Sequence, residues 1–351
     1  MQQQLIFAPV VSFLATILVV PLVILFAKKV NLMDDPKTHV HPAIIHKKPI
    51  PRAGGLAILI GIVVASLLFI PFDNFTRMIF IGGAVVVLTG ILDDKYDLSP
   101  YIRFGANILT AGIAVYSGVT IPFITNPLGG ILHFTDFSFV FLEHTFIIGD
   151  LFAIVWIVWV MNMLNWSKGV DGQMPGIAAI SAFVIGIAAF RFMPIEQSSY
   201  TISLISFIVG GAALGFLFYN FYPAKIFPGY SATILGYFIG ILSITSGVKL
   251  ATAVLVMGVP SVDAAITIVR RILTKKSPFW HDRGHLHHLL LNYGLGHRSI
   301  AVFYWIMSLI LGAVALMASS RGKLFVIMLV VVVVLGFVFM LRVAGKHQDY
   351  D

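Results

Sequence analysis

The sequence has no cysteine and few charged residues, and each absence excludes a class of protein. Without cysteine, the chain forms no disulfide and uses no thiol nucleophile, although this does not fix its compartment. Charged residues make up 11% of the 351 residues and hydrophobic residues 59%. An average soluble domain has about 25% charged residues. The composition therefore excludes a soluble globular domain and predicts an all-α, polytopic membrane protein.

Apolar runs follow one another along almost the whole chain. About 20 apolar residues are enough for a helix to cross a bilayer. Eleven runs approach that length: 5–27, 54–71, 77–92, 101–118, 146–164, 175–193, 199–219, 231–247, 249–269, 299–318 and 324–342. We expect about eleven transmembrane helices, of which the first is too long for a signal-peptide core and is retained. No soluble domain or repeat interrupts them, so residues 1–351 should form one integral-membrane domain.

The basic residues predict the orientation of these helices. Most of the 23 lysines and arginines fall in loops that alternation places on one side of the membrane. Basic loops mark the cytoplasmic side, so the N-terminus should lie outside and the C-terminus in the cytoplasm. The net charge of +8 suits anionic lipids or phosphorylated substrates. No nucleic-acid partner is expected, because the charge is spread over short loops. The external connection 119–145 has a Gly-Gly turn between β-prone runs, which predicts a small hairpin.

An acidic stretch, "LTGILDDKYDLSP", ends the third apolar run at residues 88–100. If the helix continues, Asp93 and Asp97 share one face, and Asp94 and Asp97 are three residues apart. Either pair could present oxygens to Mg²⁺, which usually takes one or two carboxylates together with phosphates and water. The alternative is a solvated loop that follows a membrane helix.

Two amides lie in "MNMLNWSKGVDG", residues 161–172, at the end of the fifth run. Asn162 and Asn165 are three residues apart and should share a helical face. Amides there can bind phosphate oxygens, sugar hydroxyls or a metal, and the alternative is hydrogen bonding between helices. The following "KGVDG", with Lys168 and Asp171, is either part of the same site or a polar loop.

Histidines gather in "HDRGHLHHLLLNYG", residues 281–294. His281, His285 and His288 have the spacing of one helical face, with His287 beside them. A zinc site is disfavoured because no thiolate or well-placed carboxylate completes it. Contact with a diphosphate is the favoured interpretation, and a histidine-rich surface helix is the alternative.

A basic segment, "HKKPIPRAGGLAI", leads into the second run at residues 46–58. Free N–H groups at that helix start, beside Lys47, Lys48 and Arg52, would form an anion site. The alternative is that these basic residues are ordinary topology signals that flank a membrane helix. All four motifs fall on the same predicted membrane face, which suits a reaction between a water-soluble phosphorylated donor and a lipid phosphate.

Taken together, these motifs resemble the polyprenyl-phosphate N-acetylhexosamine-1-phosphate transferases (glycosyltransferase family 4) along nearly the whole chain. "DRGHLHH" is similar to the form in members that use N-acetylglucosamine donors, whereas the phospho-N-acetylmuramoyl-pentapeptide branch usually has "PIHHHFE". The resemblance implies transfer of N-acetylglucosamine-1-phosphate from a UDP-sugar to undecaprenyl phosphate. This reaction releases UMP and starts a cell-envelope polysaccharide. It also implies a multi-pass protein of the bacterial inner membrane whose active site faces the cytoplasm.

The resemblance also implies roles for individual residues and a Mg²⁺ cofactor, with Mn²⁺ as the alternative ion. The metal ligands would be Asp93, Asp94, Asn165 and Asp171. The catalytic residues would be Asp93, Asp94, His285, His287 and His288. The substrates would be bound by Lys47, Lys48, Arg52, Asn162, Asn165, Lys168, Asp171 and Arg283. The partners would be the UDP-sugar, undecaprenyl phosphate and the lipid bilayer, and pairing with a second copy of the chain is left open.

Two positions depart from the family pattern. The family usually has Asn-x-x-Asp-Gly-x-Asp-Gly, but here "NWSKGVDG" places Lys168 at the first aspartate. The family's metal-binding aspartate in Phe-x-Gly-Asp is replaced by Tyr230 in "FPGYSAT". Three alternatives therefore stay open: another UDP-sugar or pentapeptide donor, a relative without catalysis, and a transporter. A transporter should carry ionisable groups inside its spans, and the runs offer little beyond Asp150 and Asp263.

The predicted orientation can be tested with two engineered cysteines, since the chain has none of its own. Ser138→Cys in the external connection should react with a membrane-impermeant thiol reagent in intact cells. Ser277→Cys in the cytoplasmic loop should react only after the cells are permeabilised. The opposite labelling pattern would invert the topology.

Overall fold

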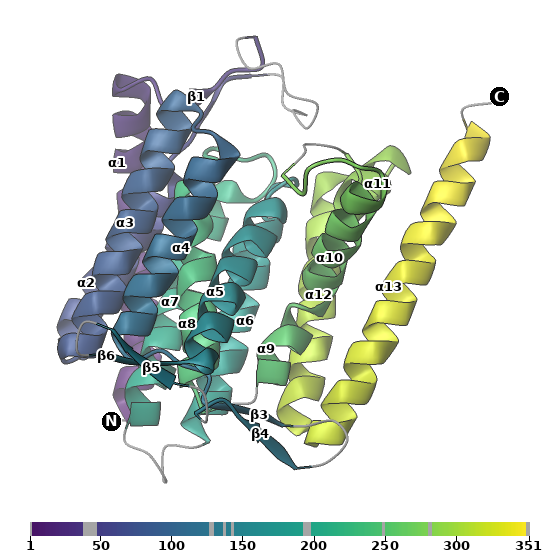
Figure 1. Cartoon of the computed structure of the whole chain (residues 1–351). Helices are drawn as coiled ribbons and strands as arrows, with labels where there is room; N and C mark the ends of the chain where they lie inside the picture. Colours follow the sequence, from purple (N-terminus) through teal and green to yellow (C-terminus); the bar gives the residue numbers. More distant parts are fainter. Residues whose placement is uncertain are drawn as a thin grey trace.

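The computed structural model describes residues 2–37, 48–125, 130–135, 138–141, 144–191, 198–247, 250–279 and 283–348. In these residues the chain forms α-helices that run mostly side by side, with three small two-stranded sheets (Figure 1). The helices are α1 (Gln2–Lys29), α2 (Gly54–Phe69), α3 (Asn74–Tyr96), α4 (Pro100–Tyr116), α5 (Ile148–Trp166), α6 (Gln173–Phe190), α7 (Ser198–Asn220), the 3₁₀ helix η1 (Ser231–Thr233), α8 (Ile234–Thr245), α9 (Leu250–Val256), α10 (Gly258–Leu273), α11 (Leu286–Asn292), α12 (His297–Met317) and α13 (Ser320–Gln348). The predicted all-α class is confirmed.

Each of the eleven apolar runs coincides with a helix or a pair of consecutive helices. Among the described residues, seven helices are long and apolar enough to cross a membrane, or eight if the bent pair α9–α10 is one span. Helix α2 and the segment Ser231–Thr245 are apolar but shorter. The chain is thus a polytopic membrane protein, while the number of eleven spans and the orientation stay predictions.

One predicted run, 249–269, is not a continuous helix. Helices α9 and α10 meet at an angle of 85° next to Met257. Pro260, in the first turn of α10, has no N–H to donate to the carbonyl of Val256, and its ring crowds that carbonyl. The chain therefore bends here, and the run predicted as one span consists of two helices.

The connection predicted to hold one hairpin holds two. Strand β3 (Phe123–Thr125) pairs antiparallel with β4 (Ile131–His133), and β5 (Ser138–Phe141) pairs with β6 (His144–Ile147). Both lie at the end of the bundle opposite to α11 and the C-terminus (Figure 1). At the other end, β1 (Met33–Asp34) pairs with β2 (Ile50–Pro51) just before α2.

Two glycines allow α2 and α3 to close on the turn η1, and this contact positions the candidate site. A methyl group at Gly55 would lie 2.1 Å from the carbonyl carbon of Ser231, and one at Gly90 would lie 2.2 Å from its Cα. The N–H of Gly55 also donates to Ser231 Oγ at 3.1 Å. Because Tyr230 directly precedes Ser231, this packing holds it against the end of α3.

Gly90→Ala should destabilise the protein, because the new methyl group meets backbone that cannot rotate away. Overpacking of this kind costs about 1–3 kcal/mol, which a lower melting temperature of the detergent-solubilised protein would report. Gly105→Ala on α4 is the matched control, since nothing lies within 4 Å of its added Cβ. Equal melting temperatures for the two variants would contradict the close contact of α3 with η1.

Candidate functional site

Two acidic side chains lie at the end of α3, and their surroundings differ. Helix α3 ends at Tyr96 because Asp97 adopts a left-handed conformation with φ of 47°. The possibility that Asp93 and Asp97 share a helical face is therefore wrong. Arg103 of α4 connects them instead, with Nε 2.6 Å from Asp93 Oδ1 and Nη2 2.7 Å from Asp97 Oδ1. Asp93 is buried, whereas the Asp97 side chain is 75% exposed.

Asp94 points in a different direction, toward the segment before η1. Its Oδ1 accepts a hydrogen bond from the N–H of Tyr230 at 2.9 Å. Its Oδ2 is buried without a hydrogen-bond partner. A methyl group at Gly229 would lie 2.1 Å from this oxygen, and Gly229 has a φ of +67°. Only glycine satisfies both the close approach and the left-handed backbone at that position.

The two positions that depart from the family pattern, Lys168 and Tyr230, lie together beside Asp94. Lys168 Nζ donates to the carbonyl of Gly229 at 3.3 Å and lies 5.8 Å from the centre of the Tyr230 ring. The Arg103 guanidinium lies 5.6 Å from the same ring. Cations near an aromatic ring face are attracted to it. Asn107, which sequence analysis did not identify, donates from Nδ2 to the Tyr230 hydroxyl at 3.0 Å.

Burial changes the acid–base properties of this pair. It lowers the pKa of the Lys168 ammonium to about 8, against the opposing attraction of the Asp94 and Asp93 carboxylates. It also raises the pKa of the Tyr230 hydroxyl to about 12, so the ring is neutral near pH 7. The site therefore contains a partly buried cation next to a neutral aromatic ring.

The histidine segment begins α11 rather than lying along one helical face. His285 is the N-cap of α11 and is extended, with φ of −70° and ψ of 150°. His281 lies outside the described residues. The prediction of a helical face that runs from His281 to His288 is therefore wrong, because the helix starts only at Leu286.

Asp263, an acid inside α10, orients His285. In the sequence this residue was notable only as an ionisable group within an apolar run. Asp263 Oδ2 lies 3.0 Å from His285 Nδ1, and Asp263 Oδ1 accepts the N–H of Leu286 at 2.8 Å. A carboxylate can only accept, so Nδ1 carries the hydrogen and Nε2 is available to a ligand. The sequence signal was a lone carboxylate in an apolar run, and its partner could not be inferred without the fold.

The three imidazoles of the segment form one cluster. The rings of His285 and His287 are nearly parallel at 5.5 Å, and those of His287 and His288 are 4.3 Å apart. His287 Nδ1 is buried without a hydrogen-bond partner. Burial, and then the charges of His288 and His285, lower the pKa of His287 well below its ordinary value. His287 is therefore neutral near pH 7, and one of its two ring nitrogens can donate a hydrogen bond.

The loop after α5 connects the acidic cluster with the histidine cluster. Lys168 reaches toward Asp94, whereas a methyl group at the next residue, Gly169, would lie 2.1 Å from His287 Nε2. Trp166 lies 6.1 Å from His285. Motifs that lie far apart in the sequence are thus brought together at one loop. This agrees with the prediction that they fall on the same side of the helix bundle.

The remaining predicted site residues have mixed environments. Asn165 Oδ1 is buried without a hydrogen-bond partner, whereas Asn162 donates to the carbonyl of Val158 in its own helix at 2.8 Å. Asp171 Oδ2 accepts the N–H of Ala224 at 3.0 Å. These contacts hold the loops around the site, and none of them tests a role in substrate binding.

The anion site expected at the start of α2 does not form. The N–H of Gly54 donates to Phe227 O at 3.2 Å, and that of Gly55 donates to Pro228 O at 3.3 Å. These donors are used by the chain itself, so the expectation of free N–H groups is wrong. Among the predicted basic residues, Arg52 pairs with Asp34 at 2.7 Å, Lys48 and Arg283 are exposed, and Lys47 lies outside the described residues.

Comparisons with known proteins identify the family of the chain. Residues 76–247 match the model of glycosyl transferase family 4. A Bacillus subtilis protein named "Probable undecaprenyl-phosphate N-acetylglucosaminyl 1-phosphate transferase" is 33% identical over 344 residues, which cover 94% of this chain and 90% of that protein. The chain belongs to glycosyl transferase family 4.

More distant members of family 4 differ in the donor that their names give. A decaprenyl-phosphate N-acetylglucosaminephosphotransferase of Mycobacterium leprae is 28% identical, over 87% of this chain and 83% of its own length. A phospho-N-acetylmuramoyl-pentapeptide-transferase of Endomicrobium trichonymphae is 27% identical, over 84% of this chain and 85% of its own length.

The residues present do not fit a resident Mg²⁺ ion. In the part of the chain that the structure describes, no group of three or more His, Asp or Glu side chains could hold a metal ion. Arg103 pairs with Asp93, and the charge of Lys168 acts on Asp94, so two cations already offset the two carboxylates. A hard divalent cation needs anionic oxygen ligands. The ligand set Asp93, Asp94, Asn165 and Asp171 therefore stays a prediction that this geometry does not support.

Asp94→Asn should lower the turnover of the family 4 transferase by about 10²–10³, the usual loss when a group that organises charge at a reacting centre is removed. Asp97→Asn is the matched control, because this side chain is exposed and contacts only Arg103 among the ion pairs described. Melting temperatures of the two detergent-solubilised variants show whether both are folded. Equal turnover in the two variants would contradict a role for Asp94 in the site.

Proposed function

We propose that the chain transfers N-acetylglucosamine-1-phosphate from UDP-N-acetylglucosamine to undecaprenyl phosphate and releases UMP. It belongs to glycosyl transferase family 4, and the names of its relatives support a phosphotransferase that acts on a polyprenyl phosphate. The reaction would start a cell-envelope polysaccharide at the cytoplasmic face of a bacterial inner membrane, the side that the basic loops predict.

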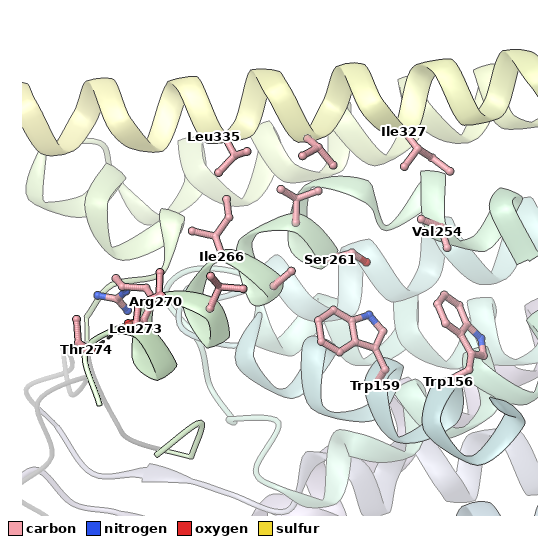
Figure 2. Close-up of a pocket in the computed structure, with 14 residues that line it drawn as sticks. Trp156, Trp159, Val254, Ser261, Ile266, Arg270, Leu273, Thr274, Ile327 and Leu335 are labelled. Atoms are coloured by element: carbon pink, nitrogen blue, oxygen red, sulfur yellow. Dashed lines mark hydrogen bonds between the residues drawn. The ribbon is translucent and has the colours of Figure 1, made fainter. Parts of the chain in front are cut away.

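An apolar cavity beside the histidine cluster carries this proposal. It has a volume of about 800 Å³ and lies between α5, the bent pair α9–α10, and α13 (Figure 2). Its walls are almost wholly apolar, and Trp159, Ile266 and Leu335 are among the lining residues. Figure 2 shows Arg270 and Thr274 together at one end of the lining residues. A long hydrocarbon chain with an anionic head requires this combination of apolar walls and a terminal cation.

The charged end of the cavity adjoins the site. A methyl group at Gly284 would lie 2.0 Å from Arg270 Nη2, so the residue just before His285 touches the Arg270 guanidinium. A lipid phosphate beside Arg270 would therefore lie close to the histidines. Helix α10, which follows the bend, supplies most of the residues of this wall.

The chemistry is a phosphoryl transfer between two anions. The acceptor phosphate needs little activation, since its second pKa is about 6 and it is mostly dianionic near neutrality. One of its oxygens attacks the phosphorus that bears the sugar, and the bond from that phosphorus to the bridging oxygen breaks, so UMP leaves with the bonding electrons. The main task of the protein is to offset anion repulsion and hold the groups in line. Lys168, Arg103 and the imidazole donors suit that task.

The decisive assay uses the purified protein, undecaprenyl phosphate and a panel of UDP-sugars, with UMP release as the readout. UDP-N-acetylglucosamine should be the best donor. Preference for the N-acetylmuramoyl-pentapeptide donor would assign the chain to the other branch of family 4. A lack of UMP release with every donor would favour a relative without catalysis.

The cavity can be tested by filling it. Val331→Trp places a large ring among the lining residues and should raise the KM for undecaprenyl phosphate about tenfold, since loss of about 1.4 kcal/mol of binding is a factor of ten. The KM for the UDP-sugar should not change. Val332→Trp is the matched control, because Val332 on the same helix is 66% exposed and does not line the cavity. Equal KM values for the acceptor in both variants would contradict this cavity as the lipid site.

A further inference from the structure

The two unusual residues of the site contact each other, and together they change its charge. Lys168 stands where the family pattern has an aspartate, and Tyr230 stands where it has a second one. We propose that Lys168 and Arg103 act as counter-charges for the reacting phosphates, so that transfer by this chain does not require a divalent cation at Asp93 and Asp94. This inference rests on the proposed function, and it concerns only how that function is carried out.

The position of Lys168 is the first support. Its ammonium group is held by the Gly229 carbonyl at 3.3 Å and by the face of Tyr230. An ammonium group has three hydrogens to donate, so this contact leaves donors for phosphate oxygens. Burial lowers the pKa of the Lys168 ammonium, and the nearby carboxylates of Asp94 and Asp93 oppose that shift.

Arg103 provides the second fixed charge. Its Nε lies 2.6 Å from Asp93, and its guanidinium lies near the Tyr230 ring, on which Lys168 also lies. Two carboxylates thus face two basic side chains around one aromatic ring. A divalent cation placed among them would be repelled by two positive groups without gaining a surplus of anionic ligands.

Tyr230 is the third support, because it fills space with a neutral ring. It is 4% exposed, and Asn107 fixes its hydroxyl at 3.0 Å. A hydrated cation would have to displace this ring from its packed position. The pair therefore works as a unit: Lys168 brings the charge, and Tyr230 occupies the position that a second carboxylate would have.

Activity without metal is the first test. After treatment with EDTA, the wild-type protein should release UMP at an unchanged rate, and added Mg²⁺ should change that rate less than twofold. Lys168→Ala should lower UMP release at least about a hundredfold, as loss of a charged group at a reacting centre usually does. Lys225→Ala is the matched control, since Lys225 is an exposed lysine that packs on Tyr219, and it should keep wild-type activity.

Metal binding is the second test and needs no activity. Titration with Mn²⁺, followed by electron paramagnetic resonance, should show no tight site in the wild type or in Lys168→Ala. The double variant Lys168→Asp/Tyr230→Asp should bind one Mn²⁺ ion, because it gains two carboxylates and loses the ammonium group. Lys168→Asp alone should not bind the ion, since Tyr230 still fills the second position. Melting temperatures show whether each variant is folded. If the double variant does not fold, the titrations of the wild type and of Lys168→Ala still test whether the chain has a tight metal site.

The outcomes separate this inference from the proposed function. UMP release that EDTA abolishes and Mg²⁺ restores would overturn the inference and leave the function standing. A tight Mn²⁺ site in the wild type would overturn it as well. A wild type that releases no UMP under any condition, yet binds no Mn²⁺, would overturn the proposed function while supporting the absence of a metal site.

Discussion

The structure depends on the pairing of buried carboxylates with basic side chains at one end of the helix bundle. Asp93 and Asp94 lie at the end of an apolar helix, where the helix dipole already disfavours negative charge. Arg103 from α4, Lys168 from the loop after α5, and the Tyr230 N–H before η1 offset that cost. Removing one partner of a buried ion pair typically costs about 3–5 kcal/mol. Three separate segments are therefore held to α3 by the same groups to which we assign a role in the proposed chemistry.

In the histidine half of the site, a different buried carboxylate also holds neighbouring segments together. Asp263 is buried inside α10, and it accepts from both the His285 ring and the backbone of α11. One carboxylate thus fixes the start of a short helix and orients the first imidazole of the cluster. Helix α10 also forms a wall of the apolar cavity, so the element that positions the histidines is the one that lines the proposed lipid site.

The sequence predicted best those elements whose formation depends on a single local pattern of residues. Apolar runs predicted the helices because burial in lipid requires internally satisfied backbone, and the four polar motifs lie at one end of the bundle. The bend at Met257 was missed because the length and hydropathy of an apolar run do not show a break within it, although Pro260 was a signal. The helical face predicted to include His285 does not form, because Asp263 holds the His285 ring and accepts the N–H of Leu286, where α11 begins. Asn107 could not be found, since its importance arises only from contact with Tyr230.

The peptide bond between Lys168 and Gly169 has a consequence for the shape of the site. One of these adjacent residues faces the aspartates, and the other touches His287. Consecutive Cα atoms are always about 3.8 Å apart, so the two halves of the site cannot separate at this point. The spacing between the acidic cluster and the imidazoles is thus limited by covalent geometry as well as by packing. A family member that accepts a bulkier donor must gain its room on another side of the site.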